Sequence, residues 1–119
     1  MKTDMDGIKE ITEKIKKFRD ERDWMQFHNH KDMALSLLLE TAEVLEHFQW
    51  KSNEEIENYT ESSKNEIADE LADVSICLFE LADNMKIDLP KAIMIKLEKN
   101  AKKYPITKAR GSNLKYNKL

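Results

Sequence analysis

The stretch LLLETAEVLEHFQW, residues 37–50, has the apolar composition of a buried helix but contains two acids, Glu40 and Glu43. Residues three or four apart lie on the same face of a helix, so both carboxylates point in one direction. Burying a carboxylate costs several kcal/mol unless a partner compensates its charge. The two acids therefore either face water or hold a cation.

A second segment, residues 66–85, also combines an apolar stripe with an acidic one. Its apolar residues recur at alternating steps of four and three from Ile67 to Met85, which predicts a helix. Beside them lies a stripe formed by Glu66, Glu70, Asp73, Cys77 and Glu80. On the helix predicted for residues 30–50, the corresponding stripe consists of Ser36, Glu40, Glu43, His47 and Trp50. If the two helices pack antiparallel, four carboxylates converge: Glu40, Glu43, Glu70 and Asp73.

Four converging carboxylates repel one another and would protonate or splay apart unless a divalent cation neutralised them. Ligands that are all oxygen favour Mg²⁺ or Mn²⁺ over zinc. Di-iron bundles use Glu-x-x-His pairs, whereas His47 comes four residues after Glu43, so we interpret His47 as a polar neighbour. The alternative of two solvated acidic faces stays open, because a single E-x-x-E pair is common on helices.

The rest of the chain predicts an all-α bundle of four to five helices, completed by oligomerisation. The sequence has only two glycines and two prolines, which favours long helices over a sheet protein rich in turns. A first helix is expected around residues 8–18 and a connection over 22–29. The segment SNEE (52–55) is a capping box that should start a short helical turn, and residues 58–65 are expected to form a loop.

A last helix should begin at Asp88, which can cap it, and Pro90 is tolerated in its first turn. Pro105 should end that helix. The 119 residues suit one domain, in which residues 106–119 form a basic tail. A few long helices in so short a chain make a thin core, so we expect a homodimer or homotetramer.

The chain is expected to be cytoplasmic. Its N-terminal MKTDMDGIKE lacks the apolar segment of a secretory signal. No apolar run approaches the roughly 20 residues that span a membrane. The single Cys77 cannot form an internal disulfide, which fits a reducing compartment.

The charge is divided unevenly along the chain. Residues from Lys96 onward include eight Lys/Arg and one acid, whereas the preceding part contains twelve basic and twenty-two acidic residues. The basic end is either a solvated tail or a clamp for a polyanion, such as nucleic acid or a nucleotide polyphosphate. The acidity of the body disfavours nucleic acid.

Several blocks of the sequence resemble the MazG-like all-α nucleotide pyrophosphohydrolases, and within them the dCTP pyrophosphatase branch. The E-x-x-E and E-x-x-D pairs resemble the signature of the superfamily. The blocks typical of the branch are RDWMQFH (22–28), FQWK (48–51), DELADV (69–74), DLP (88–90), KxxxNxxKYP (96–105) and KARGSNLKY (108–116). They occur in the same order and cover nearly the whole chain.

The resemblance implies a helical bundle that dimerises, often into a tetramer. It also implies hydrolysis of a nucleoside triphosphate to the monophosphate and pyrophosphate. A bound Mg²⁺ would make a water more acidic, and a carboxylate within hydrogen-bond reach, Glu40 or Glu43, is the expected general base. The implied metal ligands are Glu40, Glu43, Glu70 and Asp73. The implied substrate contacts are Trp24, Phe27, His28, Trp50, Lys96, Asn100, Lys103, Tyr104, Lys115 and Tyr116.

The sequence departs from the branch at three positions. Ile15 stands where the vertebrate branch has a histidine, Cys77 where it has a tyrosine, and Asp32 where asparagine is frequent. These changes leave the scaffold and the metal ligands intact but bear on the preferred base. A non-catalytic helical dimer, acting as a regulatory or nucleotide-binding module, is the rival interpretation, and in it Trp24 and Phe27 would simply fill the corner between two helices.

Overall fold

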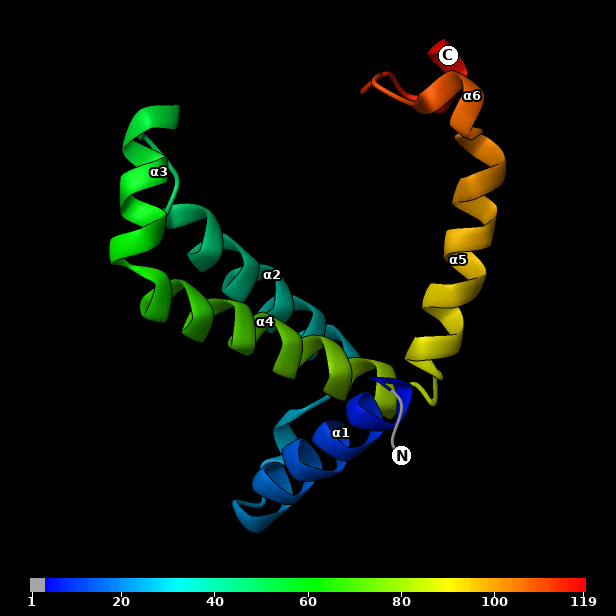
Figure 1. Cartoon of the computed structure of the whole chain (residues 1–119). Helices are drawn as coiled ribbons and strands as arrows, with labels where there is room; N and C mark the ends of the chain where they lie inside the picture. Colours follow the sequence, from blue (N-terminus) through cyan, green and yellow to red (C-terminus); the bar gives the residue numbers. More distant parts are fainter. Residues whose placement is uncertain (1–3) are drawn as a thin grey trace. The chain divides into compact units, whose positions relative to one another are not determined.

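The computed structural model describes residues 4–119, with side chains from Gly7 onward, and no strand occurs in that range (Figure 1). The all-α prediction is therefore confirmed. The helices are α1 (Asp4–Glu21), η1 (Met25–Phe27), α2 (His30–Glu46), α3 (Asn53–Ser62), α4 (Lys64–Asn84), α5 (Leu89–Lys103), α6 (Ile106–Ala109) and η2 (Tyr116–Lys118). Among the described residues, none of these helices has the length and apolar character needed to cross a membrane. The chain divides into two compact units, Met1–Lys86 and Ile87–Leu119.

The first unit is built on α2 and α4, which run antiparallel side by side (Figure 1). Helix α1 packs on α4, and α3 connects the far ends of the central pair. Among the side chains that the structure describes, the buried apolar residues are only Met33, Ile67 and Ala82. Many large apolar side chains are exposed instead, so this core is thin, as the chain length predicts.

Local sequence signals set the starts of three helices. The Asn29 side chain accepts a hydrogen bond from the backbone N–H of Asp32 and caps α2. The predicted capping box is present: Ser52 and Glu55 exchange side chain–backbone hydrogen bonds at the start of α3. Asp88 caps α5, whose first turn contains Pro90, as expected. These caps satisfy backbone N–H groups that have no partner inside the helix.

Two predicted boundaries were wrong. The segment 58–65 is not a loop, because α3 continues to Ser62 and α4 begins at Lys64. The half-buried Ile56 and Tyr59, three residues apart, give this otherwise polar segment an inner face. The helix predicted for residues 30–50 ends at Glu46, and residues 47–50 form turns, so the helical stripe does not extend to Trp50. Trp50 has φ 66° and is 92% exposed.

The second unit, Ile87–Leu119, consists of α5 and the basic segment after it. That segment, predicted from the sequence only as a basic tail, contains α6 and η2. The rings of Tyr104 and Tyr116 meet edge to face with centroids 6.2 Å apart. The Lys103 Nζ lies 5.0 Å from the Tyr116 ring centroid. These contacts hold the C-terminal segment against the end of α5.

Candidate metal centre and adjoining cavity

Helices α2 and α4 each bring two acids to one point. A carboxylate oxygen from each of Glu40, Glu43, Glu70 and Asp73 lies within 4.8 Å of the others. The spacing of three residues on each helix and the antiparallel packing of the pair produce this convergence. The sequence predicted these four residues as a group, and the structure brings them together.

Two oxygens of this cluster lack the partners that buried polar atoms normally have. Glu40 Oε2 and Glu70 Oε2 are buried and accept no hydrogen bond from any described residue. An unsatisfied buried carboxylate oxygen is costly, and a cation is one of the few groups that can compensate two of them together. The all-oxygen donor set suits a hard divalent ion such as Mg²⁺. The residues present therefore fit a divalent cation.

Hydrogen bonding, burial and mutual repulsion raise the pKa of two carboxyl groups in this cluster. A side-chain hydrogen bond with Glu43, then burial, then the charges of the neighbouring acids raise the pKa of Glu70 to about 7. Burial, followed by the charges of Glu43 and Asp73, raises the pKa of Glu40 above its ordinary value. At neutral pH the cluster thus binds protons readily unless a cation replaces them.

A cavity of about 150 Å³ lies beside this cluster in the same unit. Ser36 lies one turn before Glu40 on α2, and Cys77 lies one turn after Asp73 on α4; both line the cavity. Its lining consists of Ile15, Phe18, Arg19, Trp24, Phe27, His28, Asp32, Met33, Ser36, Ile76, Cys77 and Glu80. The wall is therefore partly aromatic, and Phe18 meets Trp24 edge to face at 5.8 Å. Flat aromatic faces of this kind suit a nucleobase.

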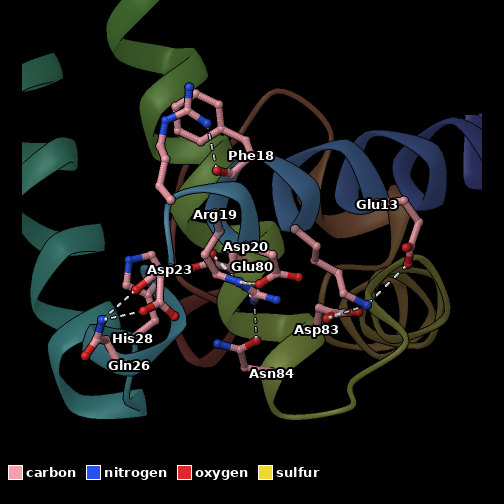
Figure 2. Close-up of polar contacts among 12 residues, drawn as sticks. Glu13, Phe18, Arg19, Asp20, Asp23, Gln26, His28, Glu80, Asp83 and Asn84 are labelled. Carbon is pink, nitrogen blue, oxygen red and sulfur yellow. Dashed lines mark hydrogen bonds and ion pairs between the residues drawn. The ribbon is translucent and has the colours of Figure 1, made fainter.

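Three residues of the lining, Arg19, His28 and Glu80, take part in polar contacts, several of which Figure 2 shows. Glu80 is 5% exposed, and its Oε2 lies 2.7 Å from His28 Nδ1. Its Oε1 lies 3.7 Å from Arg19 Nη1, and Arg19 is 7% exposed. The guanidinium also donates to Asp20 Oδ1 at 2.9 Å and to Asn84 Oδ1 at 3.3 Å. Every charged member of this group therefore has a partner of opposite charge or a hydrogen bond.

Cys77 is a neutral part of the cavity wall. Burial, and then the negative charges of Glu40, Glu80 and Asp73, raise the pKa of its thiol above the ordinary value. The thiolate, which is the nucleophilic form, is thereby disfavoured at neutral pH. Cys77 thus lines the site without the character of a nucleophile.

The other predicted site residues fall into three places. Trp24, Phe27 and His28 line the cavity. Trp50 does not line it and projects into solvent from the turn after α2. The remaining predicted substrate contacts all lie in the second unit: Lys96, Asn100, Lys103, Tyr104, Lys115 and Tyr116. His47 is outside the acid cluster, and its Nδ1 lies 2.6 Å from the Tyr59 hydroxyl, consistent with a polar neighbour.

Sequence reasoning gave no role to several residues that line the cavity, above all Arg19 and Glu80. Glu80 lies on the same stripe as Glu70 and Asp73, which was a usable signal. Arg19 gave no signal, because it lies on α1 and pairs with a residue more than sixty positions away. The three positions that depart from the dCTP pyrophosphatase branch, Ile15, Asp32 and Cys77, all line this cavity.

Comparison with known proteins agrees with this architecture. Residues 35–119 match the MazG-like family. The chain is 38% identical over 104 residues to dCTP pyrophosphatase 1 of Bos taurus, covering 86% of this chain and 62% of that protein. It is also 38% identical to dCTP pyrophosphatase 1 of Homo sapiens, covering 61% of that protein. The chain thus spans about three-fifths of the length of these curated relatives.

A solved structure, that of a pyrophosphatase from Archaeoglobus fulgidus, has the same fold. It superposes with a TM-score of 0.79 at 40% sequence identity, and the match covers 83% of this chain and 93% of that one. The matched family region includes both acid pairs, Glu40/Glu43 and Glu70/Asp73. By sequence and by fold, this chain belongs to the MazG-like family.

Proposed function

We propose that this protein is a nucleoside triphosphate pyrophosphohydrolase that uses Mg²⁺, or Mn²⁺, to convert a (d)NTP to the (d)NMP and pyrophosphate. The observation that carries the proposal is the convergence of four carboxylates, two with buried oxygens that lack partners, beside an aromatic cavity. The names of the relatives, dCTP pyrophosphatase 1 and pyrophosphatase, support it. dCTP or a modified dCTP is the proposed substrate.

In this proposal Glu40, Glu43, Glu70 and Asp73 hold the cation. When bound, a divalent cation would neutralise charge on carboxylates and phosphates alike and make a nearby water more acidic. Either Glu40 or Glu43 takes the proton of the attacking water as general base.

In this proposal the cavity holds the base. Trp24 and Phe27 contribute flat faces, and His28 contributes a polar edge. A triphosphate carries about four negative charges, so an acidic site alone would repel it. The proposed compensating contacts are Lys96, Asn100, Lys103, Tyr104, Lys115 and Tyr116, and Trp50 is the proposed contact on the turn after α2.

We further propose that the chain works as a homodimer or homotetramer. On α2, Leu38 is 65% and Leu39 64% exposed, and α5 exposes Ile93, Met94, Ile95 and Leu97. The exposed apolar side chains on each of these two helices support an interface with another copy of the chain. In this proposal residues 1–119 form one domain with a basic tail from residue 106. The protein would act on the nucleotides of the cytoplasm.

The test is a panel of ribo- and deoxynucleoside triphosphates, with Mg²⁺ or EDTA, assayed separately for pyrophosphate and phosphate. We expect pyrophosphate release that depends on Mg²⁺ and is fastest with dCTP or a modified dCTP. Phosphate release alone would place the cleavage at a different bond. If no nucleotide is hydrolysed, and Mg²⁺ with nucleotide does not raise the melting temperature, the chain is instead a non-catalytic helical module.

A further inference from the structure

Glu80 is a buried carboxylate that the proposed reaction does not use. It lies on α4, and its side chain is 6% exposed, yet it borders the cavity. A buried acid is retained in a thin core only if its surroundings compensate the charge. Two groups do so, one on α1 and one beside η1.

The first group is the Arg19 guanidinium, 3.7 Å from Glu80 Oε1. A guanidinium stays protonated in proteins, so it is a fixed positive charge. A carboxylate facing a fixed buried cation is stabilised in its ionised form. Ionised Glu80 has no proton and can only accept hydrogen bonds.

The second group is the His28 ring, whose Nδ1 lies 2.7 Å from Glu80 Oε2. Because an ionised carboxylate cannot donate, Nδ1 must carry the hydrogen in this contact. In the neutral ring, Nε2 is then a lone-pair acceptor. Nε2 has no partner among the described residues, and His28 borders the cavity, so this nitrogen is left to meet a ligand.

We propose that Glu80 is a positioning residue: it locks His28 in the Nδ1–H tautomer, so that Nε2 accepts a hydrogen bond from an exocyclic amino group of the base. The identification of the ligand as a base rests on the proposed function. An amino group offers two N–H donors, and the lining supplies a second acceptor in the exposed carboxylate of Asp32. A carbonyl oxygen facing His28 Nε2 would meet an acceptor instead of a donor and would be repelled.

The tautomer is tested directly in the wild-type full chain by the ¹⁵N chemical shifts of its histidine rings at pH 8, where free imidazole is neutral. The His28 signals are assigned by their loss in His28→Phe. We expect a protonated Nδ1 and an unprotonated Nε2. A ring protonated at Nε2, in either charge state, overturns the proposal without requiring any variant of Glu80 to fold.

The consequence for specificity is tested with dCTP and dUTP, whose bases differ at position 4, an amino group against a carbonyl, and at N3, which carries a hydrogen only in uracil. We expect wild type to prefer dCTP by roughly tenfold or more, and Glu80→Gln to lose about tenfold of that preference, mainly through KM. His28→Phe should lose the same preference. The matched control is Asp83→Asn, because Asp83 is also an α4 acid paired with an α1 cation, Lys16, but does not line the cavity (Figure 2).

The outcomes separate this inference from the proposed function. An unchanged dCTP/dUTP ratio in Glu80→Gln, or an equal loss for both nucleotides in Glu80→Gln and Asp83→Asn, contradicts the positioning role. The same preference is also measured as binding affinity by calorimetry with dCMP and dUMP in EDTA, where no turnover is needed and the triphosphate charge is absent. A wild type that hydrolyses nothing but keeps the binding preference would refute the proposed reaction and support the role of Glu80.

Discussion

Glu70 is a residue for which a proton and a divalent cation compete. Its pKa is raised to about 7, first by the hydrogen bond with Glu43 and then by burial and neighbouring charge. A proton and a divalent cation therefore compete for the same oxygen atoms. Cation binding should weaken as the pH falls through about 7, because protonated Glu70 no longer offers a charged ligand.

The first prediction concerns stability and pH at Glu70. Between pH 4.5 and about 7, the folded chain keeps a proton on Glu70 that the unfolded chain has released. The free energy of unfolding should therefore fall as the pH rises through this window. In EDTA, we expect the melting temperature of wild type minus that of Glu70→Gln to decrease by a few degrees from pH 5 to pH 8. If this difference in melting temperature is constant or increases with pH, the pKa of Glu70 is not raised.

The second prediction concerns Glu43→Gln and Asp73→Asn. Each variant should lower the rate of pyrophosphate release by roughly 100-fold or more, because a ligand of the proposed cation is lost. In EDTA both should melt no lower than wild type, because one repelling charge has been removed. The rise in melting temperature on adding Mg²⁺ should disappear. Glu66→Gln, a change of an acid on α4 outside the cluster, is the control and should behave as wild type.

At the scale of helices, the sequence predicted those features, such as helix caps, that depend on residues close together in the chain. The caps at Ser52 and Asp88 follow from side chain–backbone hydrogen bonds within four residues, and both are present. The extent of α3 was missed because its sequence is mostly polar, and the half-burial of Ile56 and Tyr59, which gives it an inner face, depends on packing in the folded unit. The acid pairs were predictable from spacing, whereas the Arg19–Glu80 pair depends on how α1 packs on α4.

The turn after α2 gives the third prediction. Trp50 is held at φ 66°, a conformation that is costly for a residue with a bulky side chain, and it is 92% exposed. Trp50→Gly relieves the backbone and loses little packing, so the free energy of unfolding should change by no more than about 1 kcal/mol. We expect KM for the nucleotide to rise several-fold, measured in the pyrophosphate assay. Trp50→Asn, which also tolerates this conformation, should give the same result; an unchanged KM in both would remove Trp50 from the substrate contacts.

On the scale of the whole molecule, the main feature is how little apolar surface is buried. Leu38, Leu39 and Leu45 of α2 are each at least 60% exposed, although they belong to the central helix pair. Chain length alone predicted a thin core, but it could not indicate which faces remain uncovered. Which faces stay exposed depends on the side of α2 against which α4 packs, and a count of residues does not contain this.

The fourth prediction is that assembly stabilises the fold. Wild type should elute as a dimer or tetramer in size-exclusion chromatography with light scattering, and its melting temperature should rise with protein concentration. Leu38→Lys, which places a charge on the exposed apolar face of α2, should shift the chain toward smaller species and lower the melting temperature by several degrees. Lys17→Ala, a change at an exposed site on α1, should do neither. A monomeric wild type with a melting temperature independent of concentration would rule out this interface.

The order of residues along α4 has a consequence for how this protein can evolve. Asp73 belongs to the acid cluster, and Cys77, one turn later, lines the cavity. One residue inserted between them would rotate the two parts of the helix by about 100° relative to each other. The two halves of the site would then face different directions, even though every side chain was still present. Insertions and deletions should therefore be absent from residues 70–80 in functional descendants and be confined to the turns, whereas substitutions that reshape the cavity remain open to selection.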